Sequence, residues 1–433
     1  MEYNKFKFKD LFEISHGYPF KSSDFSNEKT NFYVMTPGNV KIGGGIKLDK
    51  IKYLRKDTEF DKNYIFKPND IFINMTDLSK KGDTLGFPAI IPDDINNFYL
   101  HNQRLGRILN INEYRINKNY LFYLLCTREY RHHILSSATG STVKHTSPKR
   151  ILEFEVSLPN LNIQKYIGGL LNKIDKKIII NKNIIANLEE LSQTLFKRWF
   201  VDFEFPDKDG NPYKSSGGEI NDTNNLPPNW KYQSAKDIYT INIGKTPPRK
   251  LTELFNTKNG IDWVSISDMK ADGPFINITK ENLSESAVKE YRVKLVPKNS
   301  VLLSFKLTIG RVKITNKELA TNEAIAHFVT NKINSIYTYL YLKNFNFESL
   351  GNTSSIANAI NSKIVKEMPI LVPASEILEK FKEIIMPIFE KIELQQKENI
   401  LLTQLRDTLL PKLMSGEIEI PDDIEVNIDE LSI

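Results

Sequence analysis

The chain contains one long segment twice, with the two copies 214 residues apart. Residues 139–201 align with residues 353–415 without a gap, and 13 of the 63 aligned positions are identical. In each copy a proline, Pro159 or Pro373, and a short polar gap precede a run of apolar residues at helical spacing. An ungapped match of this length, with its apolar positions in the same places, indicates an internal duplication. We therefore expect a fold made of two related halves.

The duplication continues upstream, with offsets that drift where loops differ in length. Four stretches correspond: DLFEISHG (10–17) with DIYTINIG (237–244), KPNDIFIN (67–74) with VPKNSVLLS (296–304), LHNQRLGRI (100–108) with ATNEAIAHF (320–328), and INKNYLFYL (116–124) with INSIYTYLY (333–341). Alternating runs such as KFKFK and YRVKL predict half-buried strands, while residues 120–135 have the apolar spacing of a helix. The pattern predicts an α+β fold with two mixed globular domains.

The predicted order along the chain is domain, long helix, domain, long helix. The first globular domain covers 1–158 and the first long helix 159–201. A segment rich in Gly, Ser, Asn and Pro (202–228) reads as a linker. The second domain covers 229–372, the second long helix 373–415, and an acidic tail 416–433.

The two long segments are predicted to pair as an antiparallel coiled coil within the chain. Each is about 39 residues, or roughly 58 Å as a helix, and each has apolar residues in steps of three and four. Such pairing would relate the two domains by an approximate two-fold axis. The alternative is two ordinary core helices. The predicted seam residues are Ile174, Lys177, Asn181, Leu188, Leu191 and Leu195 in the first helix, and Ile388, Lys391, Gln395, Leu402, Leu405 and Leu409 in the second.

The bulk composition is that of a mildly basic globular protein. The formal net charge is +6, and residues 416–433 hold seven acidic residues and no Lys or Arg, so the rest of the chain is more basic than the whole. One cysteine, Cys126, excludes an intramolecular disulfide and fits a reducing cytosol. No apolar run approaches the ~20 residues that cross a bilayer, and the charged start MEYNKFKFKD is unlike a signal peptide. We expect a cytoplasmic protein that binds no membrane.

The sequence lacks the motifs of the common catalytic sites. The stretch IGKT (243–246) has Tyr239 where a phosphate-binding loop needs its first glycine. The stretch NPY (211–213) lacks the second proline of an adenine methyltransferase motif. The six His residues show no metal-ligand spacing. We therefore predict no catalytic residue and no metal site, and a protein that positions others.

Six stretches carry a resemblance to a known family. They are GYPFKSSDF (17–25), LHNQRLGRI (100–108), ATGSTVKHTSPKRILEFEVSLP (138–159), FKRWFVDFEFP (196–206), GKTPPRK followed by WVSISDM (244–250 and 263–269), and LLPKLMSGEIEI (409–420). Together with the alternation of two domains and two matching helices, they resemble the specificity subunit of type I restriction–modification systems. The resemblance covers essentially the whole chain.

The resemblance implies a non-catalytic DNA-recognition subunit of a phage-defence system. In that family each globular domain is a target-recognition domain that reads one half of a bipartite double-stranded DNA site. The coiled coil spaces the two halves and docks two methyltransferase (M) subunits, and restriction (R) subunits then join. The resemblance implies no cofactor in this chain, because S-adenosylmethionine, ATP and magnesium are used by the partners.

Candidate DNA contacts follow from residue type and position. Lys and Arg bind phosphates, while Asn, Gln, Arg, Ser and Thr read base edges. In the first domain the candidates are Lys21, Ser22, Asn74, Lys80, Lys81, Asn102, Gln103, Arg104, Gly140, Ser141, Thr142 and Lys144. In the second they are Lys245, Thr246, Arg249, Ser265, Ser267, Lys306, Arg311, Asn322, Ser354, Ser355 and Asn358. The alternatives are solvated surface charges for Lys and Arg, and buried turn residues for Asn102 and Asn322.

Two other functions remain open at this point. One is a restriction enzyme or methyltransferase that acts alone, which predicts S-adenosylmethionine binding by the isolated chain. The other is a coiled-coil scaffold that reads no sequence, which predicts that no DNA sequence is enriched in a binding selection.

Overall fold

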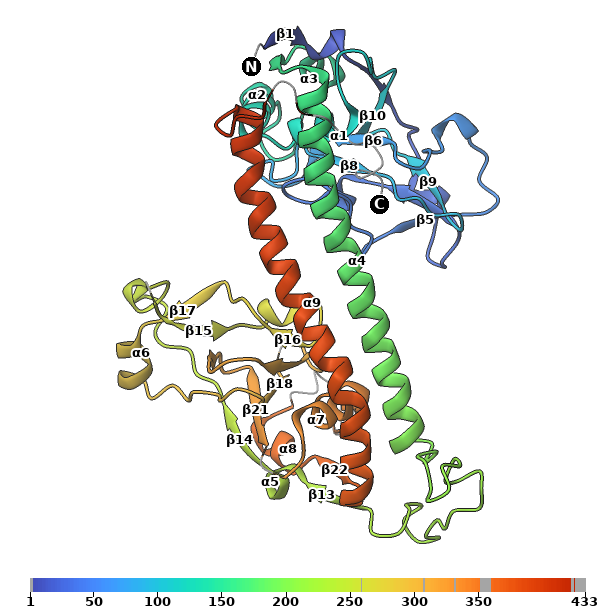
Figure 1. Cartoon of the computed structure of the whole chain (residues 1–433), viewed down its shortest axis with the longest axis vertical. Coiled ribbons are helices and arrows are strands. Elements are labelled where there is room, and N and C mark those ends of the chain that lie inside the picture. The colour runs from blue at the N-terminus through green and yellow to red at the C-terminus, as the bar shows by residue number, and fades with distance from the viewer. Residues whose placement is uncertain are drawn as a thin grey trace. The chain divides into compact units, whose positions relative to one another are not determined.

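The computed structural model describes residues 3–257, 259–306, 308–330, 332–350, 360–421 and 424. The chain forms two compact units, unit 1 (Met1–Lys177 with Leu402–Ile433) and unit 2 (Ile178–Leu401). Each unit holds a mixed α+β domain and a part of both long helices, α4 (Leu161–Phe200) and α9 (Ser375–Ser415) (Figure 1). The predicted fold class, two mixed domains with two long helices, is confirmed.

Unit 1 contains two four-stranded sheets. The first has the order β2-β10-β6-β8 and is antiparallel throughout. The second has the order β3-β5-β4-β9, in which β4 and β9 run parallel. Strand β1 pairs with β12 and β7 with β11. The strands are β1 (Asn4–Lys7), β2 (Glu13–His16), β3 (Phe25–Ser26), β4 (Phe32–Met35), β5 (Lys52–Leu54), β6 (Ile71–Asn74), β7 (Thr76–Asp77), β8 (Pro88–Ile90), β9 (Phe98–His101), β10 (Leu105–Leu109), β11 (Lys144–His145) and β12 (Glu155–Leu158).

Unit 2 repeats this plan. Its larger sheet has the order β14-β21-β18-β19-β16, and its smaller sheet, β17-β15-β20, again contains one parallel pair, β15 with β20. Strand β13 pairs with β22. The strands are β13 (Lys231–Ser234), β14 (Tyr239–Ile243), β15 (Ile261–Val264), β16 (Phe275–Ile276), β17 (Glu281–Leu283), β18 (Val301–Ser304), β19 (Val312–Thr315), β20 (Ala320–Thr321), β21 (Ile325–Thr330) and β22 (Pro369–Val372).

Shorter helices also recur at equivalent places. Helix α1 follows β10 in unit 1 as α7 follows β21 in unit 2, and each begins at an asparagine cap: Asn117 accepts from the backbone N–H of Tyr120, and Asn334 from those of Ile336 and Tyr337. The four matched stretches of the sequence therefore lie on equivalent elements, which confirms the duplication. The helices are α1 (Lys118–Leu124), α2 (Arg128–Ser137), α3 (Pro148–Leu152), α5 (Ala235–Ile238), α6 (Glu285–Glu290), α7 (Ser335–Asn344) and α8 (Ser362–Glu367).

The long helices pair antiparallel in both units. In unit 1, Arg406 near the end of α9 donates to Asp175 in α4 (Nη1–Oδ1 2.7 Å), and Asp175 also accepts from the hydroxyl of Tyr123 in α1. In unit 2, Phe200 at the end of α4 packs edge-on against Phe381 near the start of α9. Early residues of one helix thus meet late residues of the other, as predicted.

The predicted seam matches the buried face of each helix at some positions and misses it by one residue at others. For example, Ile178 is buried in place of Lys177, and Ser192 in place of Leu191. Lys177 and Lys391 are exposed, and Leu191 and Leu405 keep 45% and 47% of their surface exposed. These four predictions are wrong. The buried residues of the two helices include Leu171, Ile174, Ile178, Asn181, Ile185 and Ser192 on α4, and Phe381, Ile385, Phe389, Ile392 and Gln395 on α9. Runs such as Ile178–Ile180 allow either register in sequence, and packing against the domains selects between them.

The other predicted seam residues face inward. Ile174, Asn181 and Gln395 are buried, while the rest are half-buried: Leu188, Leu195, Ile388, Leu402 and Leu409. Two polar members of the predicted seam, Asn181 and Gln395, are therefore buried. Asn181 donates through Nδ2 to Glu398 Oε2 (2.9 Å) and Asn399 Oδ1 (3.1 Å). A buried polar pairing of this kind fixes the register of two helices.

Residues 202–228, predicted as a linker, pack on unit 2. Phe205 stacks on Tyr213 and on Trp230, with ring centroids 4.5 and 5.3 Å apart, and Leu226 is buried in the same core. Among the described residues, no helix has the length and hydropathy needed to span a bilayer.

Candidate nucleic-acid interface

In both units a glycine lets the loop after one strand, β2 or β14, approach the turn that joins the two main sheets of that unit. A Cβ on Gly17 would lie 2.4 Å from the carbonyl of Asn102, and one on Gly244 would lie 2.2 Å from the carbonyl oxygen of Asn322. Neither position tolerates a side chain. The loop after β2 and the β9–β10 turn are thus held together in unit 1, as are the loop after β14 and the β20–β21 turn in unit 2. These paired loops carry many of the predicted contacts.

In the β9–β10 turn, one candidate side chain is buried and supports the turn, and two others are exposed. Asn102 is buried, and its Oδ1 accepts from the backbone N–H of Arg104 (3.2 Å); Asn322 does the same for Ala324 (3.1 Å). Both asparagines therefore hold turns, in line with the alternative reading of them. Gln103 and Arg104 are exposed at the tip, as are Lys21 and Ser22 on the neighbouring loop.

A second basic loop of unit 1 is organised by a buried carboxylate. Asp77 accepts from the backbone N–H of Ser79 (2.6 Å) and from the N–H and hydroxyl of Thr84 (2.5 and 2.6 Å). Burial raises the pKa of Asp77, but the hydrogen bonds from Thr84 and Ser79 outweigh it, so the pKa lies below its ordinary value. The ionised carboxylate closes the loop that presents Lys80 and Lys81, both exposed. Sequence reasoning named the lysines and missed Asp77.

Asn74 is the clearest exception among the unit 1 predictions. It is fully buried, its Nδ2 donates to Thr84 Oγ1 (2.8 Å), and its Oδ1 accepts from the backbone N–H of Thr76 (3.2 Å). This side chain supports the lysine loop and has no surface to offer DNA. Its place at the end of a wholly buried strand, β6, explains the burial.

The remaining unit 1 candidates form a tight hairpin tip. Thr139 and His145 exchange two backbone hydrogen bonds (3.0 and 2.9 Å). Gly140 has φ +93°, where a Cβ would collide with the carbonyl of Val143. Gly140, Ser141 and Thr142 are exposed and Lys144 is half-buried. The hairpin is fixed to the body by a hydrogen bond between His145 Nδ1 and Thr76 Oγ1 (3.1 Å).

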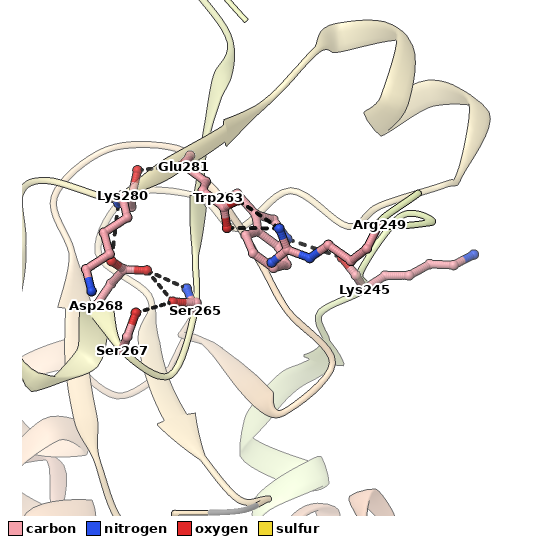
Figure 2. Close-up of polar contacts among 9 residues, drawn as sticks. Lys245, Arg249, Trp263, Ser265, Ser267, Asp268, Lys280 and Glu281 are labelled. Carbon is pink, nitrogen blue, oxygen red and sulfur yellow. Dashed lines mark hydrogen bonds and ion pairs between the residues drawn. The ribbon is translucent and has the colours of Figure 1, made fainter. Parts of the chain in front are cut away.

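In unit 2 the loop after β14 carries Lys245, Thr246 and Arg249. Figure 2 shows Lys245 and Arg249. The backbone N–H of Lys245 donates to Thr321 (2.9 Å) and its carbonyl accepts from Trp263 Nε1 (3.3 Å), so the start of the loop is anchored. Thr246 donates to Glu323 through its hydroxyl. Lys245 is exposed, and its ammonium group extends away from Trp263 and Arg249.

Arg249 is held by groups that the sequence analysis did not single out. Its Nη1 donates to Glu281 Oε1 and Oε2 (2.8 and 3.0 Å), and its guanidinium carbon lies 4.5 Å from the ring centroids of both Phe255 and Trp263. Trp263 and Glu281 are cross-strand neighbours on β15 and β17. In the sequence, only the stretch WVSISDM (263–269), which begins with Trp263, pointed to these residues around Arg249.

Asp268 organises the neighbouring serine turn. It is buried, and its Oδ2 accepts from the N–H and hydroxyl of Ser265 (2.8 and 2.6 Å) while its Oδ1 accepts from the N–H of Lys280 (3.2 Å) (Figure 2). Ser265 also bonds to Ser267 (2.8 Å), and Ser267 is the exposed member.

The other unit 2 candidates divide between surface and support. Lys306 is exposed, whereas Arg311 is half-buried and donates through Nη1 to the carbonyl of Ile266 (2.7 Å). Ser354, Ser355 and Asn358 lie outside the described residues. Among the described residues there is no group of three or more His, Cys, Asp or Glu that could hold a metal ion.

The comparison with known proteins decides the family. The sequence matches the type I restriction modification DNA specificity domain over residues 1–190 and 227–404. The chain belongs to this family. The two matched regions correspond to the two copies of the duplication, as expected for a family member that has two recognition domains.

Individual relatives agree with this assignment. The chain is 27% identical over 314 residues to the MjaIX specificity subunit of a type I restriction enzyme from Methanocaldococcus jannaschii, covering 70% of this chain and 69% of that one. It is 25% identical over 412 residues to the HindI specificity subunit from Haemophilus influenzae, covering 78% and 87%. The solved S subunit from M. genitalium has the same fold, with a TM-score of 0.59 at 15% identity and 98% and 97% coverage.

Proposed function

We propose that the chain is the DNA sequence-specificity subunit of a type I restriction–modification complex. Each domain reads one half of a bipartite double-stranded site, and α4 with α9 sets the spacing between the halves. The observation that carries this proposal is a repeated scaffold with unlike loops. The glycine contact recurs in both units, yet it is followed by Tyr18 to Ser22 in one and by Lys245 to Arg249 in the other. Equal scaffolds with different polar loops suit two readers of different sequence.

The charges on these loops support a DNA partner. Lys80 and Lys81 in unit 1 and Lys245 in unit 2 are exposed and make no ion pair with a carboxylate of the described chain. Such ammonium groups bind phosphates without reading sequence. Gln103, Arg104, Ser267 and Arg249 add the hydrogen-bonding groups that read base edges.

Two methyltransferase subunits are the proposed partners of the long helices. The exposed faces of α4 and α9 carry apolar side chains at equivalent positions of the repeat. Ile180 and Leu394 are 44% and 59% exposed, and Leu191 and Leu405 are 45% and 47% exposed. Apolar residues exposed on a helix away from its partner favour a protein contact, and the same pattern on both helices favours two copies of one partner. Restriction subunits join the resulting core.

The chain itself is proposed to be non-catalytic and to bind no cofactor. S-adenosylmethionine, ATP and magnesium belong to the methyltransferase and restriction subunits. Purified chain should therefore show no S-adenosylmethionine binding in calorimetry, whereas a methyltransferase that acts alone would bind it.

A binding selection tests the proposal as a whole. The full chain, alone and with its cognate methyltransferase, is incubated with random duplex DNA, and bound molecules are sequenced; the modified motif in host DNA is read in parallel. We expect one interrupted motif with two unlike halves from both measurements. A scaffold that does not read sequence would enrich nothing, and a single uninterrupted motif would contradict two readers.

A further inference from the structure

The guanidinium group of Arg249 is held in one orientation before any ligand binds. Its Nη1 donates to both carboxylate oxygens of Glu281, and its guanidinium carbon lies 4.5 Å from the ring centroids of both Phe255 and Trp263. Both rings are buried, at 7% and 1% exposure, and pack edge to face with centroids 5.9 Å apart. Because an arginine side chain ordinarily loses much rotamer freedom on binding, this fixed placement lowers the cost of using it.

One edge of the same guanidinium is open. All hydrogen bonds of Arg249 within the described chain are made by Nη1, which leaves the N–H donors of Nε and Nη2 without a protein acceptor. The side chain as a whole is 49% exposed, so a ligand in solution can reach it. Nε and Nη2 form a planar fork that matches two adjacent acceptors, such as O6 and N7 of guanine or two phosphate oxygens.

The charge of Glu281 distinguishes between these two ligands. The carboxylate lies within 2.8–3.0 Å of Nη1 and offsets the positive charge of Arg249, and it would repel a phosphate placed beside the pair. A guanine edge is neutral and does not face this penalty. By contrast, three exposed lysines near this ion pair have no carboxylate partner within the described residues. Lys245 and Lys250 lie in the loop of Arg249, and Lys280 directly precedes Glu281. The lysines suit phosphates, and the paired arginine suits a base.

We propose that Arg249 is a specificity-determining residue of unit 2 and reads one guanine in the major groove through Nε and Nη2. Glu281, Phe255 and Trp263 are its positioning residues. This inference rests on the proposed function and adds to it the identity of one base. It assigns no base to unit 1, where Ser22 stands at the corresponding position of the loop.

The test begins with the selected motif of the wild-type full chain bound to its methyltransferase. The second half-site should contain an invariant guanine. Arg249→Ala and Arg249→Lys should each lower the preference for that guanine by roughly ten- to a hundredfold, because a lysine lacks the fork. All other positions, including the half-site of unit 1, should keep their preference. The matched variant Lys250→Ala should instead weaken binding to every sequence alike and reduce the salt slope by about one.

A modified base makes the test independent of protein folding. With the wild-type chain, 7-deazaguanine at the assigned position removes the N7 acceptor and should weaken binding severalfold, while Arg249→Ala should not respond to it. If Arg249→Ala lowered the affinity for all DNA sequences equally and reduced the salt slope, Arg249 would contact a phosphate, and the inference would be overturned. A wild-type chain indifferent to 7-deazaguanine at every guanine would also overturn it, with the proposed function intact. A selection that enriches no sequence would refute both.

Discussion

At the scale of single residues, the charge of Glu281 governs how Arg249 behaves. Glu281→Gln keeps one acceptor for Nη1 but removes the negative charge, so the guanidinium becomes a freer cation. We expect binding to random DNA to tighten severalfold and the preference for the guanine to fall. The salt slope should steepen by up to about one. Filter binding to specific and random duplexes at several salt concentrations measures all three.

The control for Glu281→Gln is Glu285→Gln. Glu285 is exposed in the same unit, and within the described chain neither a hydrogen bond nor an ion pair joins it to Arg249. Both variants change the net charge equally, so both should tighten non-specific binding, but only Glu281→Gln should alter base preference. Identical base preferences in the two variants would contradict a positioning role for Glu281.

A buried histidine makes the stability of unit 2 depend on pH. His327 is fully buried beside Thr321 (Nε2–Oγ1 2.6 Å), and burial lowers its pKa from an ordinary 6.5 to about 4. The folded state therefore binds fewer protons than the unfolded chain between these values, so stability is full above pH 6.5 and falls as the pH drops towards 4. The loss is on the order of 3 kcal/mol.

Tryptophan fluorescence measures this effect, because all three tryptophans, Trp199, Trp230 and Trp263, belong to unit 2. His327→Gln should flatten the pH dependence of urea unfolding between pH 6.5 and 4 by about that amount. His132→Gln, at an exposed position, should leave the curve unchanged. An unaltered slope in His327→Gln would show that other groups carry the acid sensitivity.

Sequence reasoning found the exposed cations but not what holds them. Lys80 and Lys81 are conspicuous as a basic pair in a polar stretch, and their exposure follows from the cost of burying charge. Asp77, Asp268 and Glu281 act through contacts between elements far apart in the chain, which single-sequence patterns do not contain. Asn74 was misjudged for the same reason: its neighbours, Thr84 and a buried strand, decide its role.

At the scale of elements, helix length and antiparallel pairing were predictable, whereas the register was not. The predicted seam and the buried face share Ile174 and Asn181, and they differ at the seam position between these two residues. The correct choice, Ile178 over Lys177 and Ser192 over Leu191, depends on how the helices pack against the domains. The duplication could have helped, since the buried residues Ile178 and Ile392 are repeat equivalents.

The register predicts opposite effects for two apolar truncations on α4. Ile185 is 4% exposed, so Ile185→Ala should cost about 2–4 kcal/mol of unfolding free energy. Leu191 is 45% exposed, so Leu191→Ala should cost less than about 1 kcal/mol yet weaken methyltransferase binding. Urea unfolding followed by fluorescence gives the first quantity, and calorimetric titration gives the second. Equal destabilisation by both variants would argue against the buried face described above.

At the scale of the whole molecule, each long helix contributes to both units. The boundary between units falls after Lys177 in α4 and after Leu401 in α9. Within unit 1, Asp175 meets Arg406, and within unit 2, Asn181 meets Asn399. The duplication thus yields one scaffold twice, and the proposed spacing function depends on the length of helix that continues from one unit into the other.

Inserting seven residues into each helix, after Lys177 and after Leu401, tests that function. Seven residues keep the heptad phase and add roughly 10 Å of helix, close to three base-pair steps of about 3.4 Å. We expect the unspecified gap of the methylated motif to lengthen by about three base pairs with both half-sites unchanged, as read by sequencing modified bases in cells that also express the methyltransferase. An insertion in α4 alone mismatches the helices and should abolish methylation. A gap that stays the same while methylation persists would show that the helices do not set the spacing.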